Sequence, residues 1–150
     1  MSFFIHLFLF VFLFVPISLF FHELGHALMA LVFRASNVSI HIGRGKHLCH
    51  LTLRRFSLWI YMNVFLYYMT EYERTDPFTH RERIMIALMG PIVNGIIGFT
   101  SFLLYKELFT NKVLLFCTLF NWWLMIANLF PFKIGQKQSD GYTIYTLLFK

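Results

Sequence analysis

An apolar run over residues 3–33 reads FFIHLFLFVFLFVPISLFFHELGHALMALVF. Its ionisable side chains are three histidines and one glutamate, namely His6, His22, Glu23 and His26. The run exceeds the roughly 20 apolar residues that a helix needs to cross about 30 Å of hydrocarbon. It lacks the basic start and small-residue cleavage site of a signal peptide, so we expect it to stay attached. We predict a transmembrane helix over residues 3–34, with a kink or change of direction at Pro16.

Two further segments are long enough to cross a membrane. Residues 84–105 and 113–132 contain no Asp, Glu, Lys, Arg or His, and we predict helices over 84–105 and 113–130. The chain as a whole is 58% hydrophobic and 13% charged, which excludes both an ordinary soluble domain and a disordered chain. The sequence therefore predicts an all-α polytopic membrane protein with three long transmembrane helices in a single domain, residues 1–150.

The remaining segments are predicted to lie beside the membrane. Residues 37–55 alternate between apolar and polar side chains around a turn at 43–46, which predicts a small membrane-adjacent β-hairpin. Residues 56–69 are apolar and rich in aromatic side chains, but they are too short to span with ease, so we expect an interfacial or re-entrant segment. Residues 139–149 predict a short C-terminal helix that opens with Asp140-Gly141.

Basic residues are unevenly distributed about the three long segments. Eight lie between the first and the second, and Lys133 and Lys137 follow the third, whereas only Lys106 and Lys112 lie between the second and the third. The positive-inside rule places the basic segments in the cytoplasm and the N-terminus outside. The net charge of +6 is then a topology signal, with no nucleic-acid partner. We expect a multi-pass protein of a bacterial cell membrane, with the lipid bilayer as its surroundings.

The residues that point to chemistry are His22-Glu23-Leu24-Gly25-His26. Helix residues four apart lie on the same face, so both imidazoles can bind one metal ion. Glu23 is placed to take a proton from a water on that ion. A charged side chain inside an apolar helix costs at least about 2.5 kcal/mol, which favours a functional role. The alternative is a set of polar residues that are hydrogen-bonded within a helix bundle.

A catalytic zinc site requires a third protein ligand. Asp140 is the candidate on the predicted cytoplasmic side, although an Asp at this place could instead cap the last helix. The acidic residues Glu71, Glu73, Asp76 and Glu82 lie among basic residues and indicate a solvated loop. His47, Cys49 and His50 could form a second metal cluster, but exposed strand residues are the favoured interpretation, because adjacent strand positions point to opposite faces.

Four stretches, in this order, resemble the site-2 proteases, a family of intramembrane zinc metalloproteases. They cover nearly the whole chain and comprise His22-Glu23-Leu24-Gly25-His26-Ala27, the strand-like segment 38–53, Gly90-Pro91-Ile92-Val93-Asn94, and Asn128-Leu129-Phe130-Pro131 followed by Asp140-Gly141. Residues 132–139 depart from the family's usual apolar, Pro-rich run, and no accessory domain is expected beside this core.

The resemblance implies one zinc ion per chain and assigns the site residues by position. The expected ligands are His22, His26 and Asp140, with Glu23 as catalytic acid/base and with Asn94 and Asn128 holding the substrate or the developing oxyanion. For Asn94, the alternative is a hydrogen bond between helices, which Gly90, Gly95 and Gly98 would allow to approach closely.

The implied function is that of a zinc-dependent intramembrane endopeptidase. It would cut a transmembrane protein or peptide substrate, and a regulatory membrane partner is expected to control it. The segment 38–53 is expected to hold the unwound substrate by strand addition. The alternative is a non-catalytic zinc-binding membrane protein that acts as a partner or chaperone for other membrane segments.

Overall fold

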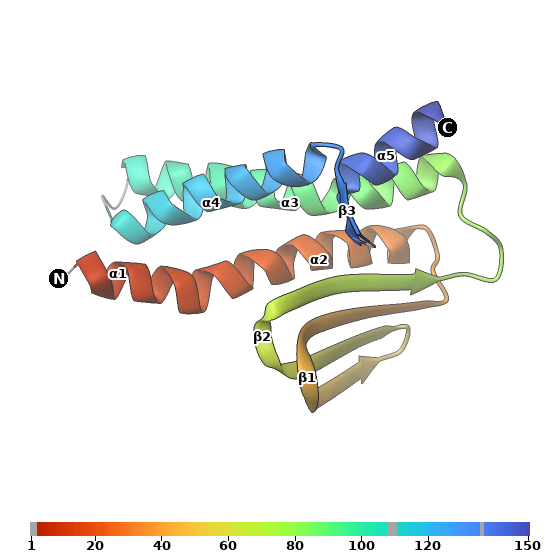
Figure 1. The fold of residues 1–150 in the computed structure, drawn as a ribbon, viewed down its shortest axis with the longest axis horizontal. Coiled ribbons are helices and arrows are strands. Elements are labelled where there is room, and N and C mark those ends of the chain that lie inside the picture. The colour runs from red at the N-terminus through yellow and green to blue at the C-terminus, as the bar shows by residue number, and fades with distance from the viewer. Residues whose placement is uncertain (1–2, 108–110, 136) are drawn as a thin grey trace.

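The computed structural model describes residues 3–107, 111–135 and 137–150, apart from the side chain of Leu66. Long helices form a bundle, and a β-sheet packs beside the helix that carries both histidines of the motif (Figure 1). The helices are α1 (Phe3–Leu9), the π-helical turn η1 (Phe10–Phe14), α2 (Val15–Val32), α3 (His80–Glu107), α4 (Lys112–Leu129) and α5 (Asp140–Phe149). The strands are β1 (Asn37–Leu53), β2 (Phe56–Glu73), β3 (Lys133–Ile134) and β4 (Lys137–Gln138).

The first three helical elements follow one another without a break. Pro16 lies in the first turn of α2, directly after the π-helical turn η1. Since proline cannot donate the usual helical hydrogen bond, a wider turn at this point accommodates its ring. The helix ends where the amide of Ala35 donates to the carbonyl of Ala30 and Arg34 takes a left-handed backbone. The predicted helix 3–34 is thus confirmed to within two residues.

Three helical stretches within the described residues are long and apolar enough to cross a membrane, at residues 3–32, 80–107 and 112–129. Many of their large apolar side chains point away from the bundle, as with Phe4 at 77% exposed, Val32 at 70% and Ile126 at 63%. Such a surface would be unfavourable in water but suits the hydrocarbon of a bilayer. The two predicted helices 84–105 and 113–130 are confirmed, with the first beginning four residues earlier, at His80.

Strands β1 and β2 form one long antiparallel hairpin that turns at residues 54–55 and folds back on itself. Residues 37–42 pair with 68–73 on one side and with 56–60 on the other. In the second pairing the two segments run parallel, because the residue numbers of the partners increase in the same direction. At its start the amide of Val38 donates to the carbonyl of Arg55 at 2.8 Å. The fold-back occurs at 43–46, where Gly43 and Gly45 adopt positive φ angles. Residues 37–42 are therefore an inner strand, and 68–73 form an edge.

This topology corrects several predictions. The segment 56–69, which we expected to be interfacial or re-entrant, is most of strand β2, and the sheet extends well beyond the predicted hairpin 37–55. Residues 43–46, which we expected to form the hairpin turn, form a bend within strand β1 instead. The hairpin turn lies at residues 54–55. The inner strand 37–42 has partners on both sides, so this part of the segment 38–53 cannot accept a further strand, whereas residues 47–53 are paired with 56–61 alone. The fold is helical with a substantial sheet instead of all-α.

The apolar face of the sheet packs against the C-terminal half of α2 (Figure 1). Val38 and Ile40 are fully buried against Ala27 and Ala30 of this helix. Burial of a valine or isoleucine side chain contributes about 1.5–3 kcal/mol, so this contact fixes the position of the sheet. The edge strand 68–73 is thereby placed beside the histidine motif of α2.

Arg74 joins three elements at the end of the sheet. Its guanidinium donates to the carbonyl of Phe33 after α2 and, through two nitrogens, to both carboxylate oxygens of Glu82 in α3. Glu82 also accepts from the amide of Thr79, whose hydroxyl accepts from the amide of Glu82. This reciprocal arrangement is a capping box, and it fixes the start of α3.

We expect Arg74→Ala to lower the thermal midpoint of the protein in detergent by several degrees, because the variant leaves carbonyls and the Glu82 carboxylate without their donor. The matched control is Arg81→Ala, which removes an exposed arginine from the first turn of the same helix. Circular dichroism at increasing temperature measures both. Equal midpoints for the two variants would contradict the structural role of Arg74.

Candidate metal centre and catalytic site

Three side chains from the two ends of the chain meet at one point. His22 and His26 come from consecutive turns of α2, and Asp140 is the first residue of α5. The Nε2 atoms of the histidines are 3.2 Å apart. The carboxylate of Asp140 lies 3.2 Å from Nε2 of His22 and 3.4 Å from Nε2 of His26. The sequence therefore predicted the members of this cluster, and the fold brings them together.

These spacings fit a tetrahedral metal ion. Zinc binds histidine nitrogen and carboxylate oxygen at about 2.0–2.2 Å, so two ligands of a tetrahedral ion are about 3.3 Å apart. The three observed separations scatter around this value. Within the described residues, these are the side chains of His, Cys, Asp or Glu that cluster closely enough to hold an ion.

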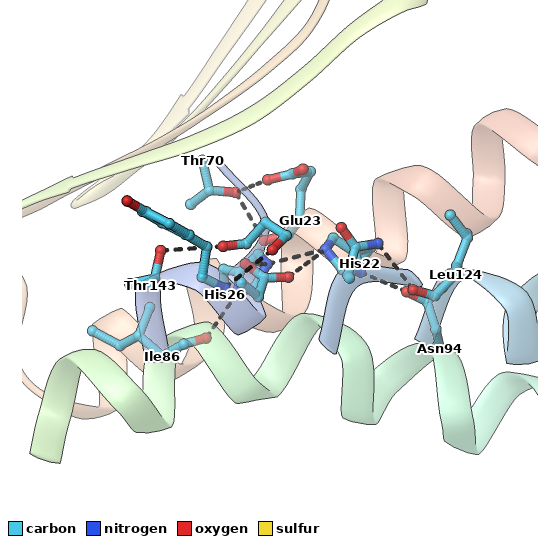
Figure 2. A network of polar contacts seen from close by, with 12 residues as sticks. His22, Glu23, His26, Thr70, Ile86, Asn94, Leu124 and Thr143 are labelled. Carbon is cyan, nitrogen blue, oxygen red and sulfur yellow. Dashed lines mark hydrogen bonds and ion pairs between the residues drawn. The ribbon is translucent and has the colours of Figure 1, made fainter. Parts of the chain in front are cut away.

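The hydrogen bonds of the two Nδ1 atoms also favour a metal ion between the histidines and Asp140. Nδ1 of His22 faces Oδ1 of Asn94 at 2.5 Å, and Nδ1 of His26 faces the carbonyl of Ile86 at 2.7 Å (Figure 2). Both partners are acceptors, so the Nδ1 atoms carry the protons and the Nε2 lone pairs point toward each other and toward Asp140. Facing lone pairs and a carboxylate repel one another unless a cation lies between them. The donor set therefore fits a zinc ion.

Asp140 is held in place by its neighbours. Ser139 caps α5, since its hydroxyl accepts from the amide of Tyr142, so the alternative role of Asp140 as the cap is wrong. A Cβ atom at Gly141 would lie 2.0 Å from the carbonyl of Leu129, so only glycine lets α5 begin against the end of α4.

Glu23 is positioned by the edge strand of the sheet. The hydroxyl of Thr70 lies 2.8 Å from Oε2 of Glu23 and 3.0 Å from its backbone carbonyl (Figure 2). This contact fixes the carboxylate beside the histidines. Thr70 was missed in the sequence, because a single threonine in an apolar segment carries no recognisable signal.

A cavity of about 350 Å³ opens over the cluster. Its lining includes the side chains of the site, the edge strand and the start of α5, namely His22, Glu23, His26, Tyr68, Met69, Thr70, Tyr72, Ile86, Ala87, Asn128, Gln138, Asp140 and Thr143. It combines a polar floor with room for an extended peptide segment. Asn128 lies on this lining, where a substrate could reach it, and its predicted role in substrate binding stays a prediction.

Asn94 is fully buried and faces the protein interior. Its Nδ2 atom donates to Oδ1 of Asn121 at 2.9 Å, and Asn121 donates in turn to the hydroxyl of Ser18 at 3.0 Å. This chain fixes the Asn94 amide with its oxygen toward His22. The arrangement favours a role in orienting His22, in line with the predicted interhelical hydrogen bond, and the oxyanion role of Asn94 stays a prediction. Asn121 was missed, although a polar residue inside an apolar helix is itself a signal.

Gly90 makes room for the histidines against α3. A Cβ atom at this position would lie 2.3 Å from Nε2 of His26 and 2.9 Å from Cε1 of His22. Any larger residue would displace the two rings. The next residue, Pro91, cannot donate a hydrogen bond to the preceding turn of α3.

The second candidate cluster does not form a metal site in the described part of the chain. His47, Cys49 and His50 are all exposed. The rings of His47 and His50 pack around Trp59, the latter stacked at 3.8 Å between centroids. The favoured interpretation, exposed strand residues, is confirmed.

Comparison with known proteins adds independent information about this chain. The model of a protein family described as peptidase family M50 matches residues 8–113, which is more than half of the chain. The match includes the histidine motif, strands β1 and β2 and the whole of α3, and it ends before Asp140. A search of curated proteins finds no match.

We expect the purified protein to contain about one zinc ion per chain and Asp140→Ala to lose most of it, because two histidines alone form an incomplete site. Elemental analysis after dialysis measures the zinc content. Asp76→Ala, which removes an exposed carboxylate from the loop before α3, should keep the full content. A zinc-loaded Asp140→Ala protein would remove Asp140 from the ligand set.

Asn94→Leu is expected to weaken zinc binding by about 10- to 100-fold, since loss of a partner that orients a ligating histidine has effects of this size. Competition with a chromophoric chelator measures the affinity. Asn128→Leu is the matched control, because Asn128 lines the cavity without a contact to either histidine. If Asn94 acts only on the substrate, both variants will bind zinc as the wild type does.

Proposed function

We propose that this chain, which belongs to peptidase family M50, the site-2 protease family, is a zinc-dependent intramembrane endopeptidase. Family membership makes it a metalloprotease, and its three long apolar helices support an integral membrane protein. The observation that carries the proposal is the convergence of two imidazole lone pairs and one carboxylate at tetrahedral spacing, with Glu23 beside them. The cofactor is one zinc ion held by His22, His26 and Asp140.

When bound there, zinc supplies a water molecule of lowered pKa and polarises the scissile carbonyl. Glu23 acts as the general base that takes the proton of the attacking water and then returns it to the leaving amine. Thr70 supports this role, because its hydroxyl keeps the carboxylate turned toward the cavity. Asn94 keeps the Nδ1 proton of His22 in place, so that Nε2 stays available as a ligand.

The substrate is a transmembrane protein whose cleavable segment must first unwind, because backbone carbonyls in a membrane helix are occupied by helical hydrogen bonds. The edge strand 68–73 is suited to hold the unwound segment. It pairs with 37–42 on one side, and the sheet register records no partner on its other side among the described residues. A peptide added along this edge passes Thr70 and Glu23, so strand addition would bring its carbonyls to the catalytic cavity.

The site is proposed to face the cytoplasm. The basic residues between α2 and α3, together with those that follow α4, outnumber those between α3 and α4, and the positive-inside rule assigns this side to the cytoplasm. Helix α5 and the sheet lie toward this end of the bundle (Figure 1). Water would then reach the cavity from the cytoplasmic side.

Glu23→Gln is expected to lower cleavage by at least about a hundredfold, because an amide cannot accept the proton of the attacking water. The variant should keep its zinc, since Glu23 is outside the ligand set. The assay follows fragments of epitope-tagged single-span membrane proteins that are co-expressed with each variant.

The matched control is Glu73→Gln, which changes an exposed carboxylate at the end of the same edge strand and should cleave like the wild type. Equal cleavage by Glu23→Gln and the wild type would contradict the assignment of the base. A wild type that binds zinc and cleaves none of a broad panel would favour the non-catalytic alternative.

A further inference from the structure

A second cavity, of about 660 Å³, adjoins the catalytic one. It is lined by Arg44, Tyr67, Tyr68, Met69, Lys133, Lys137 and Gln138, and we call it the basic groove. Tyr68, Met69 and Gln138 line both cavities, so the two share a wall. A chain that lies in the catalytic cavity can therefore extend into the basic groove.

Three cations from two separate elements converge on this groove. Arg44 comes from the bend of the sheet, and Lys133 and Lys137 come from the small β3–β4 hairpin before α5. The guanidinium carbon of Arg44 lies 4.7 Å from the centroid of the Tyr67 ring, and Nζ of Lys137 lies 4.9 Å from the same centroid. These cation–π contacts hold two charged groups at one aromatic ring in spite of their mutual repulsion.

Among the described residues, no carboxylate lies within ion-pair distance of Arg44, Lys133 or Lys137, and Glu71, which lines a neighbouring cavity with Arg44, lies 3.6 Å from Nε2 of His41. The ion pairs between described residues involve Arg74 and Lys106, and the remaining close contacts of carboxylates are with the rings of His22, His26 and His41. The groove therefore presents three positive charges, next to a cavity in which a peptide is to be cut. A ligand with negative charge would satisfy them.

The edge strand determines how far the basic groove lies from Glu23. Thr70 touches the catalytic Glu23, and Tyr67 stands three residues earlier on the same strand. At about 3.3 Å per residue, this separation is about 10 Å, or about three residues of an extended peptide beside the strand.

We propose that the basic groove recognises an acidic segment of the substrate, with Asp or Glu side chains about three residues from the scissile bond. This inference rests on the proposed function, and it names the substrate class of that site. Arg44, Lys133 and Lys137 are then specificity-determining residues. The shared lining favours a peptide over an anionic lipid headgroup, because a peptide bound in the catalytic cavity lies next to the groove.

The test is a binding measurement on zinc-loaded Glu23→Gln protein, which cannot turn over its ligand, in a neutral detergent. The probes are fluorescent ten-residue peptides that carry four Asp and Glu residues, or Asn and Gln at the same places, read by fluorescence polarisation. We expect the acidic peptide to bind about tenfold more tightly at low salt, with the difference shrinking as ionic strength rises.

Adding Arg44→Gln, Lys133→Gln and Lys137→Gln together should remove this preference and leave zinc content and thermal midpoint unchanged. The matched control adds Lys46→Gln, Arg55→Gln and Lys106→Gln, which remove the same charge outside the groove and should keep the preference. The single variant Lys137→Gln should lose part of the preference for the acidic peptide. It provides a second test in case the triple variant misfolds.

Equal binding of the acidic and amide peptides would overturn the proposal. So would a groove-dependent affinity for vesicles of anionic lipid with no preference among peptides, which would assign the groove to lipid headgroups. Because binding is measured without cleavage, a wrong assignment of the groove can be distinguished from a wrong assignment of the protease activity. A wild type that prefers acidic peptides but cleaves nothing would keep the groove and refute the protease.

Discussion

Two hydrogen bonds between helices α2 and α3 determine what the site can be. Each histidine of α2 gives its Nδ1 proton to an acceptor on α3, one to the side chain of Asn94 and the other to the carbonyl of Ile86. Both Nε2 lone pairs are thereby directed to one point. The close approach that makes these bonds requires the missing side chain of Gly90, and Asn121 of α4 fixes the orientation of the Asn94 amide. The helix bundle thus holds both imidazoles in the tautomer that carries its proton on Nδ1.

The sheet contributes the second half of the site. Its buried residues Val38 and Ile40 pack on the same helix that carries the histidines. This contact fixes the position of the edge strand beside the cavity. One residue of this edge, Thr70, touches the catalytic carboxylate. The groove at Tyr67 adds charge at one end of the same edge. The contact to Glu23 and the aromatic ring of the proposed substrate groove thus lie along a single strand.

The sequence was most informative where physical requirements are strict. Long apolar runs located the three spans, and the spacing of His22 and His26 with the isolated charge of Glu23 identified the centre of the site. Asp140 needed the resemblance to a family, because an aspartate before a helix has several ordinary roles. The sheet was less predictable. Segment 56–69 is apolar and aromatic on both faces, which hides the alternation of a strand, and the hairpin turns at Arg54-Arg55, which carry no turn signal. Thr70 and the orientation of Asn94 depend on contacts between segments far apart in sequence, which no local pattern encodes.

The third ligand reaches the histidines from a helix that begins more than a hundred residues later in the chain. Between them, the polypeptide passes through the sheet and through two further membrane-crossing helices. An error in the insertion of either helix would leave Asp140 on the opposite side of the bilayer from His22 and His26, with only two ligands in reach of each other. For the proposed protease, correct topology would thus be a condition of activity: a wrongly inserted copy would lack the third ligand, and the site would be assembled only when every crossing has the correct direction.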